Sequence, residues 1–383
     1  MKRMMGKGWK RFLLTGALAA FVVAGLPATD VAAKAVVNGF DLQAHRGGRD
    51  ARAENTLYAF AYAMELGVTT LEMDMQLTKD GRLVISHNPV MNWMLAKGPD
   101  GQYAPKQNPP DIRTMNLAEV QQYDMGVMNP AAGGYYDLHG KTQIATPGAQ
   151  MPTLEQVFEL ANAYGNKKVI FNIETKSYAD PEDPYYANTP DPDVFVEKVY
   201  EVVKKYNMQD RVTIQSFDWR TLKAMKAIAP ELTLVALSSE QPSWGKSGMY
   251  LRLGEKAPSP HLGGLNINDF KGDYVKAAKE IGADVVSPYF KELSPDLIDE
   301  AHALGMKVVP WTVNSPKDME MLLAMGVDGI ISDQPWVLRD VLIKKGIAVP
   351  EPTPAPKGMK YSTGTAINKV EVKKAKGGAD ASH

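Results

Sequence analysis

Short apolar runs alternate with amphipathic stretches along most of the chain. Eight runs rich in apolar and β-branched residues predict strands, at 40–45, 69–77, 167–175, 211–217, 232–238, 283–290, 306–313 and 328–333. The stretches with helical spacing between them predict helices, at 55–66, 153–165, 192–207, 218–229, 272–282, 294–305 and 315–326. Several of these helices begin on Ser, Thr or Asp and several end on Gly, which are residue types that cap helices.

Strand–helix alternation of this kind predicts a parallel sheet. Eight such units in roughly 300 residues have the number and size of a (β/α)8 barrel. A doubly wound open sheet is the alternative, but no Gly-rich dinucleotide turn or P-loop follows the first predicted strand. We therefore expect an α/β fold of the TIM barrel type.

Two segments interrupt the alternation. Residues from about 88 to 150 are rich in Pro, Gly, Asn and Asp and have few periodic runs, which predicts an insertion that covers a site. Just before it, residues 83–87 predict a short strand that pairs with the second strand through a turn at 79–81. A second, smaller excursion spans residues 238–264.

The two ends of the chain differ from the middle. Residues 1–35 combine a basic start, a short apolar run at 12–26 and a small-residue pattern at Ala33 and Ala35, which predicts a cleaved signal peptide. A retained membrane anchor is the alternative, but the apolar run is short for a span and ends at Pro27. We expect export, to a bacterial periplasm or the medium, with no stable membrane anchor after cleavage. Residues 36–348 then form the barrel, and the Pro- and Lys-rich residues 349–383 predict a disordered tail.

Charge and composition narrow the function classes. The formal net charge is -1, so no overall positive field attracts nucleic acid, and we expect no nucleic-acid partner. The chain has no cysteine, which excludes thiolate catalysis, disulfides and cysteine-based zinc sites.

Acidic residues alternate with apolar residues in two predicted strands. Glu72 and Asp74 share one side of the strand at 69–77, and Glu174 lies at the end of the strand at 167–175. In a barrel, the C-terminal ends of the strands converge, so these acids are expected to meet at its mouth. Three carboxylates favour a hard divalent ion, Mg²⁺ or Ca²⁺, over zinc. Solvated acids at strand ends are the alternative.

Two histidines and two cations follow the same strands. His45 and His87 each end a short strand next to the acids, and together they offer an acid and a base for ester cleavage. Arg46 and Lys176 suit a phosphate, as a planar fork and a point charge. The alternatives are buried structural imidazoles and solvated cations. His139 and His261 fall in irregular segments and are expected to be exposed, with a contact to the site as the alternative for each.

These motifs together resemble one enzyme family. The stretch "HRGGRDARAENTLYAFAYAMELGVTTLEMDMQLTKDGRLVISHNP" is similar almost throughout to the opening signature of the glycerophosphodiester phosphodiesterases. "FNIETK", "IQSFDW", "VVPWTVN" and "GVDGIISDQP" resemble its later strand motifs, in the same order. The resemblance covers roughly Phe40 to Leu342, is specific, and looks closest to the exported, periplasmic branch.

The resemblance implies a (β/α)8 barrel with a small insertion after the second strand. It implies that Glu72, Asp74 and Glu174 bind the metal, that His45 and His87 are the acid–base pair, and that Arg46 and Lys176 bind the phosphate. Glu54 belongs to the "ENT" motif and either contacts the site or orders the first loop, and Trp311 either lines the glycerol pocket or packs. One position departs from the family, because Asn88 stands where an Asp commonly follows the second histidine.

The expected function is hydrolysis of a small-molecule glycerophosphodiester to glycerol 3-phosphate and an alcohol, with a Ca²⁺ or Mg²⁺ cofactor. Two alternatives stay open from the sequence. The same site could act on a lysophospholipid or a teichoic-acid-like polymer, a choice that the two excursions would set. Alternatively, the barrel could be a non-catalytic surface binding protein with the tail as its attachment arm.

Overall fold

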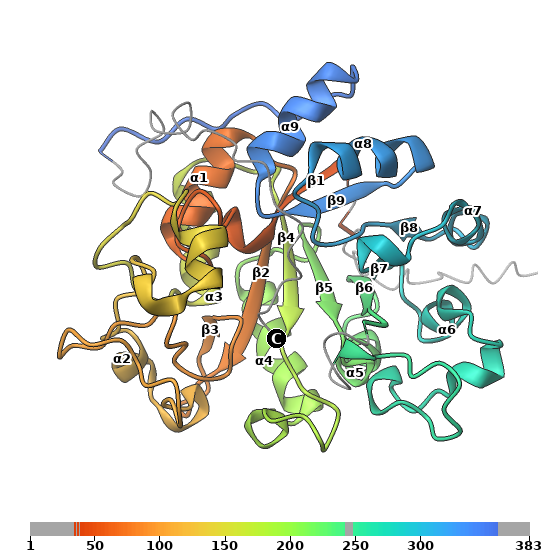
Figure 1. Ribbon diagram of the computed structural model, residues 1–383, viewed down its shortest axis with the longest axis horizontal. Coiled ribbons are helices and arrows are strands. Elements are labelled where there is room, and N and C mark those ends of the chain that lie inside the picture. Colours follow the sequence, from red (N-terminus) through yellow and green to blue (C-terminus); the bar gives the residue numbers. More distant parts are fainter. Residues whose placement is uncertain (1–33, 36, 38, 242–247, 359–383) are drawn as a thin grey trace, which may run out of the picture. The chain divides into compact units, whose positions relative to one another are not determined.

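A barrel of parallel strands forms the centre of the protein (Figure 1). The structure, a computed structural model, describes residues 34, 35, 37, 39–241 and 248–358. Its parallel strands are β1 (Asp41–Ala44), β2 (Thr70–Leu77), β4 (Ile170–Thr175), β5 (Val212–Ser216), β6 (Thr233–Ser238), β7 (Val285–Pro288), β8 (Lys307–Val308) and β9 (Gly329–Ser332). Each lies within a run that was predicted as a strand, because buried apolar and β-branched residues define these runs.

The strand order closes the sheet on itself. The hydrogen-bonded order is β8-β7-β6-β5-β4-β2-β1-β9, and all neighbours along it are parallel. Between the two ends of this order, the Asp328 amide donates to the Val308 carbonyl at 2.9 Å and the Ile331 amide to the Pro310 carbonyl at 3.0 Å. The result is a nearly closed barrel of eight parallel strands, which confirms the predicted TIM barrel.

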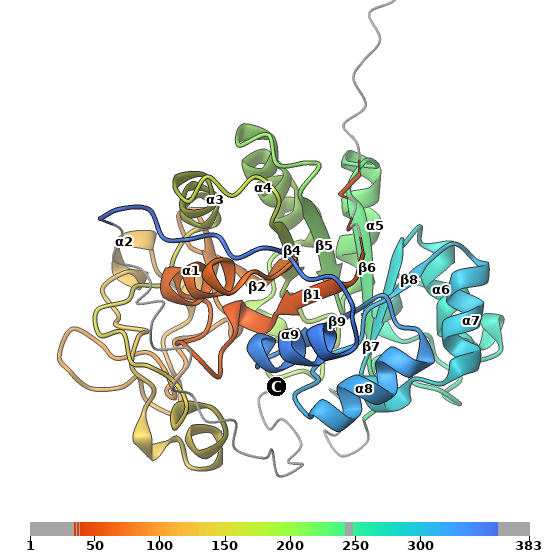
Figure 2. The same ribbon diagram turned by 90° about the horizontal axis from the view of Figure 1, so that it is seen from above.

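Helices connect consecutive strands and surround the barrel (Figure 2). They are α1 (Leu57–Leu66), α3 (Leu154–Ala163), α4 (Pro192–Lys205), α5 (Trp219–Ile228), α6 (Tyr274–Glu280), α7 (Pro295–Ala303), α8 (Pro316–Met325) and α9 (Pro335–Lys344). The predicted caps are present: the side chains of Thr56, Thr153 and Asp218 accept backbone N–H groups of the first helical turn. Helix α9 is absent from the helices predicted above.

The two faces of strand β2 explain how the core and the site are separated. Leu71, Met73 and Met75 point outward and are fully buried among helix residues such as Phe60 and Phe158. Burying side chains of this size contributes about 1.5–3 kcal/mol each. The opposite face carries the acids into the barrel, as the alternation predicted.

The barrel interior has a polar part next to an apolar part. The Asn172 amide donates to the side-chain oxygens of Gln43 and Gln215, both at 2.9 Å. A separate apolar cluster on the other strands contains Val235, Val285, Val309 and Ile331. Buried amides with their partners in place form a rigid layer, and this layer lies directly beside the acids of β2 and β4.

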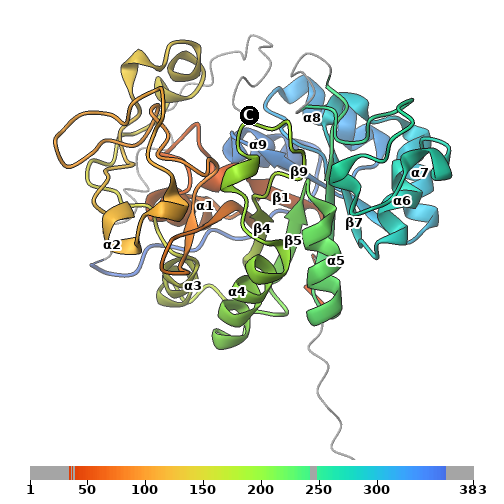
Figure 3. The ribbon, with the colours of Figure 1, turned by 90° about the horizontal axis from the view of Figure 1, so that it is seen from below.

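The segment between the second and third parallel strands has its own small core. Strand β3 (Leu83–Ile85) pairs antiparallel with β2, as predicted. Beyond it, the predicted insertion contains helix α2 (Leu117–Val120) and short helical turns, including a π-helix at Tyr136–Gly140. Its apolar residues, among them Met91, Ile112 and Val120, form a cluster separate from the main core. Figure 3 shows this segment beside β2 and α1, in orange to yellow.

The chain beyond α9 lies against the barrel before it leaves the described part. The Thr353 amide donates to the Met64 carbonyl at 2.9 Å, the Asn166 amide donates to the Thr353 hydroxyl at 2.9 Å, and Arg339 donates to the Pro350 carbonyl at 2.7 Å. Pro350 and Thr353 are therefore held against the barrel, whereas the sequence predicted disorder from Val349. Their partners are distant in the sequence, so composition alone does not indicate these contacts.

Both predicted terminal segments fall mainly outside the described residues. Residues 1–33 of the predicted signal peptide and residues 359–383 of the predicted tail are not described. Export and the disorder of the remaining tail therefore stay predictions. Among the helices that are described, none combines the length and apolar character needed to cross a bilayer.

Candidate active site

A tight turn after β1 places two predicted site residues. His45 follows the strand directly, and Arg46, Gly47 and Gly48 all have positive φ, at 50°, 80° and 91°. A Cβ atom on Gly47 would lie 2.7 Å from the Cβ atom of Ala59, so only glycine fits there. The unusual backbone directs the Arg46 amide to Glu72 Oε2 at 2.8 Å. The first loop is thereby tied to the acids of β2.

The three predicted acids converge. Asp74 in β2 and Glu174 in β4 are direct neighbours in the strand register, and Glu72 lies two residues before Asp74 on the same face. One carboxylate oxygen from each lies within 4.8 Å of the others, and all three residues are buried. Burial and the repulsion from Asp74 and Glu174 raise the pKa of Glu72 well above its usual range. Burial raises the pKa of Glu174 to about 7, although Lys176 opposes this shift.

Neutral and cationic partners hold each acid in place. The Gln215 amide donates to Glu72 Oε1 at 2.7 Å, and the Asn55 amide donates to Asp74 Oδ2 at 2.9 Å. Burial opposes ionisation of Asp74, but the charges of Arg46 and Lys176 outweigh it and lower the pKa of this carboxyl. Within the described part of the chain, the buried Asp74 Oδ1 atom has no hydrogen-bond partner. An ionised oxygen left open among three converging carboxylates fits a hard divalent cation.

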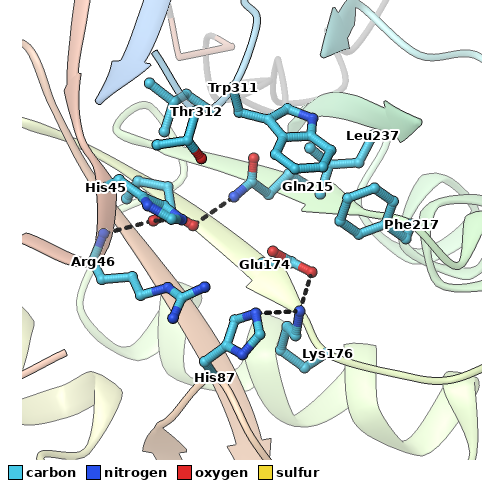
Figure 4. A pocket seen from close by; sticks show the side chains of 12 residues that line it. His45, Arg46, His87, Glu174, Lys176, Gln215, Phe217, Leu237, Trp311 and Thr312 are labelled. Atoms are coloured by element: carbon cyan, nitrogen blue, oxygen red, sulfur yellow. Dashed lines mark hydrogen bonds and ion pairs between the residues drawn. The ribbon is translucent and has the colours of Figure 1, made fainter. Parts of the chain in front are cut away.

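Lys176 connects the acids to the second histidine. Its Nζ atom lies 3.0 Å from Glu174 Oε1 and 3.2 Å from His87 Nε2 (Figure 4). His87 follows β3, whose pairing with β2 brings the imidazole to the mouth of the barrel. The two predicted histidines line the same pocket as Glu72, Glu174, Arg46 and Lys176.

Asp333 is a site residue that sequence reasoning missed. It lies directly after β9, and its Oδ1 atom is 2.5 Å from His45 Nδ1. Arg49 donates to both of its oxygens, at 2.7 and 3.2 Å. Burial opposes ionisation here, but Arg49 and His45 outweigh it and hold the pKa of Asp333 well below its usual range. Asp333 lies at the end of a predicted strand, as the other acids do, and this position could have indicated that it belongs to the site.

The buried Asp333 carboxylate orients His45, while burial favours the neutral form of the imidazole. Burial lowers the pKa of His45, and Arg46 adds to this effect, while Asp333 opposes it. With Nδ1 directed to Asp333, the Nε2 atom lies 3.9 Å from Glu72 Oε2 on the pocket side. The imidazole therefore faces the converging acids with the nitrogen that is free to exchange a proton.

Glu54 contacts Arg46, one of the predicted site residues. Its Oε1 atom accepts a hydrogen bond from Arg46 Nη1 at 3.0 Å, and its Oε2 atom accepts one from the hydroxyl of Tyr135. Glu54 and Tyr135 are buried. Tyr135 comes from the insertion, and no periodic pattern in that segment predicted it.

Apolar side chains form the opposite side of the pocket. Trp311 lines it, with its indole N–H bound to the Ser287 carbonyl at 2.9 Å, and Phe217 and Leu237 lie beside it. Figure 4 shows these side chains across the pocket from His45, Arg46 and His87. The pocket thus has a charged side and an apolar side. This combination suits a small ligand that carries both a charged group and a hydrocarbon part.

Two histidines expected on the surface are buried. His139 Nδ1 lies 2.5 Å from Asp50 Oδ1, and His261 packs its ring 4.7 Å from the ring of Tyr250. Both side chains are in irregular segments, which fold back onto the barrel rather than into solvent. The departure at Asn88 is also accommodated, because its side-chain oxygen accepts a hydrogen bond from Asn92 at 3.1 Å.

Comparisons with known proteins agree with this geometry. The model of the glycerophosphoryl diester phosphodiesterase family matches residues 45–337. A glycerophosphodiester phosphodiesterase of Caldanaerobacter subterraneus subsp. tengcongensis is 31% identical over 307 residues, which are 79% of this chain and 97% of that protein. A crystal structure from Silicibacter pomeroyi that bears the same family name aligns with a TM-score of 0.68 and 27% identity, over 82% of this chain and 97% of that one. An Oleispira antarctica phosphodiesterase, solved with the product sn-glycerol-3-phosphate, aligns with a TM-score of 0.56 and 21% identity, over 79% of this chain and 96% of that one.

Proposed function

Since the chain belongs to the glycerophosphoryl diester phosphodiesterase family and is a glycerophosphodiester phosphodiesterase, we propose a metal-dependent hydrolysis with two histidines as acid and base. The substrates are small glycerophosphodiesters, and the products are glycerol 3-phosphate and an alcohol. The observation that supports this most is the convergence of three carboxylates with His45 and His87 in one pocket. The product bound to the Oleispira phosphodiesterase is consistent with it.

Glu72, Asp74 and Glu174 would hold the cation, Mg²⁺ or Ca²⁺. When bound, such an ion acts as a Lewis acid on a phosphoryl oxygen. Without it, burial and then the mutual repulsion of three acids within 4.8 Å raise the pKa values of Glu72 and Glu174. All three residues offer carboxylate oxygens, which are the ligand atoms that hard cations prefer.

Arg46 and Lys176 would offset the charge of the phosphate. Both cations are buried at the edge of the pocket, where a low dielectric strengthens their attraction for an anion. The Lys176 ammonium contacts Glu174 and His87 and has three donor hydrogens, so it can also donate to a substrate oxygen. Arg46 is fixed by Glu54, which keeps its guanidinium plane in one orientation.

The two histidines would move the protons. One imidazole takes a proton from the attacking oxygen and the other gives a proton to the departing alcohol, which keeps the charge of the pocket constant. His45 is suited to hold a proton transiently, because the Asp333 carboxylate stabilises the imidazolium. His87 Nε2 accepts a hydrogen bond from the Lys176 ammonium, so its lone pair is directed to Lys176, which lines the same pocket and must release it before His87 takes up a proton there.

Release of glycerol 3-phosphate from glycerophosphocholine tests the proposal. We expect activity in the full chain, loss with a chelator and recovery when Mg²⁺ or Ca²⁺ is added back separately. His45→Ala and His87→Ala should keep metal binding and lose hydrolysis by about 10²–10⁴-fold, the usual contribution of general acid–base catalysis. Full activity in either variant, or activity that resists chelation, contradicts the mechanism. Lysophosphatidylcholine as a parallel substrate tests the larger-substrate alternative.

A further inference from the structure

The insertion is attached to the first loop of the barrel by several hydrogen bonds. The Tyr135 hydroxyl donates to Glu54, and His139 Nδ1 contacts Asp50 Oδ1 at 2.5 Å. The side-chain amide of Gln143 donates to the Arg49 carbonyl at 2.6 Å, and the Ile144 amide donates to the Ala51 carbonyl at 3.0 Å. Residues 135–144 therefore lie along the same loop that carries His45 and Arg46.

One of these contacts leads directly to a phosphate-binding residue. Tyr135 binds one oxygen of Glu54, and the other oxygen of Glu54 binds Arg46 Nη1 at 3.0 Å. All three side chains are buried, at 8%, 4% and 3% exposure, so water does not replace a lost partner easily. Burial and the adjacent Glu54 raise the pKa of Tyr135 well above its usual range, so the hydroxyl keeps the proton that it donates.

We propose that Tyr135 is a positioning residue for the phosphate site: its hydroxyl fixes Glu54, and Glu54 fixes the guanidinium of Arg46 toward the substrate. This inference rests on the proposed function of Arg46. The insertion then completes the active site from outside the barrel.

The alternatives open to Glu54 explain why the tyrosine hydroxyl matters. Arg49 Nη1 lies 3.9 Å from Glu54 Oε2 and 3.4 Å from the Tyr135 hydroxyl. Without the hydroxyl, Glu54 is free to turn its second oxygen toward Arg49 or to take Arg46 in a two-point contact. Either change draws the Arg46 guanidinium out of its present orientation, while the fold keeps its apolar contacts.

The test compares two tyrosines of the same insertion. Tyr135→Phe removes the hydroxyl that reaches Glu54, and Tyr103→Phe is the matched control, because its hydroxyl donates to the Val127 carbonyl at 3.1 Å inside the insertion. Each is made in the wild-type and in the Arg46→Ala background, with full-length protein. The measurements are kcat and KM for glycerophosphocholine, the Kd for inorganic phosphate with Mg²⁺ present, and the melting temperature.

We expect Tyr135→Phe to lower kcat/KM and phosphate affinity by about 10-fold, the worth of one hydrogen bond to a charged group. The control should change both by less than about 2-fold at a similar melting temperature. In the Arg46→Ala background, Tyr135→Phe should have no further effect on either quantity. An equal loss in both backgrounds, or no difference from Tyr103→Phe, overturns the proposal.

Two further arms keep the outcome interpretable. If Tyr135→Phe does not fold, Glu54→Gln replaces it and must show the same dependence on Arg46; full phosphate affinity in Glu54→Gln rejects the proposal. If the wild-type protein does not hydrolyse glycerophosphocholine, the proposed function fails, and the phosphate measurements still decide the role of Tyr135.

Discussion

The Nδ1 atom of His45 lies 2.5 Å from the Oδ1 atom of Asp333. These residues follow the neighbouring strands β1 and β9, whose last residues, Ala44 and Ser332, are paired in the sheet. The contact therefore joins the first and last strands of the barrel at the active site. It also fixes which nitrogen of His45 faces the pocket.

We predict that Asp333→Asn lowers kcat by about 10- to 100-fold, less than removal of the imidazole itself. The amide keeps the shape of the side chain but does not stabilise an imidazolium on His45. Steady-state kinetics on glycerophosphocholine measure the effect. Asp328→Asn is the matched control, because Asp328 contacts His302 at 2.9 Å at the opposite end of β9. Equal losses in the two variants contradict the prediction.

We predict opposite effects of Glu174→Gln on stability and on metal binding. The pKa of Glu174 is raised to about 7, so ionising it destabilises the folded protein as the pH rises from about 4.5 to 7. The amide removes this penalty, and at pH 8 the metal-free variant should gain about 1–3 kcal/mol in free energy of unfolding.

The same variant should bind Mg²⁺ or Ca²⁺ at least about 10-fold more weakly, since it loses a charged ligand. Urea unfolding without metal and calorimetric titration with metal give the two quantities. A metal-free variant less stable than the wild type at pH 8 would contradict the raised pKa of Glu174.

We predict that His261 makes the free energy of unfolding decrease in acid. Burial lowers the pKa of this histidine to about 4, and neither ring nitrogen has a hydrogen-bond partner among the described residues. The unfolded chain takes up a proton near pH 6.5, so stability falls as the pH drops from about 6.5 to 4, by about 1–3 kcal/mol.

His261→Phe keeps a ring against Tyr250 and removes the titration. Urea unfolding at several pH values should then show that the free energy of unfolding of this variant falls less steeply on the acid side. The control is His302→Gln, a histidine with 41% of its side chain exposed. A decrease in His261→Phe as steep as that of the control rejects this prediction.

We predict that the residues after α9 stabilise the barrel. Truncation after Val349 removes the hydrogen bonds of Pro350 and Thr353 to Arg339, Met64 and Asn166. Each contributes about 1 kcal/mol, so the melting temperature should fall by several degrees, at about 2–4 °C per kcal/mol for a domain of this size. Truncation after Gly358 is the control, and thermal unfolding of both measures the effect. Equal melting temperatures would show that residues 350–358 add nothing.

The features that were predicted correctly from the sequence are those that follow from local backbone geometry. Strand alternation placed Glu72 and Asp74 on one face, and the convergence of strand ends brought Glu174 to them, because both rules follow from backbone geometry. The histidines at 45 and 87 were found for the same reason. The barrel itself followed from the repeated alternation.

The missed features depend on contacts between distant segments. Tyr135 lies in a segment without periodicity, so nothing local indicated that it reaches Glu54. The burial of His139 and His261 was missed because irregular segments were taken to be exposed. Asp333 was within a predicted strand, but its role depends on His45, which is 288 residues earlier.

The pairing of β1 with β9, which brings Asp333 to His45, has a consequence for how the enzyme becomes active. His45 is synthesised early and acquires its buried carboxylate partner only when the last strand has been made and has docked. A long-range contact of this kind forms late, since the ends of a long loop must first be brought together. Growing chains that already contain every metal ligand and both imidazoles should therefore remain poor catalysts until the polypeptide is nearly complete.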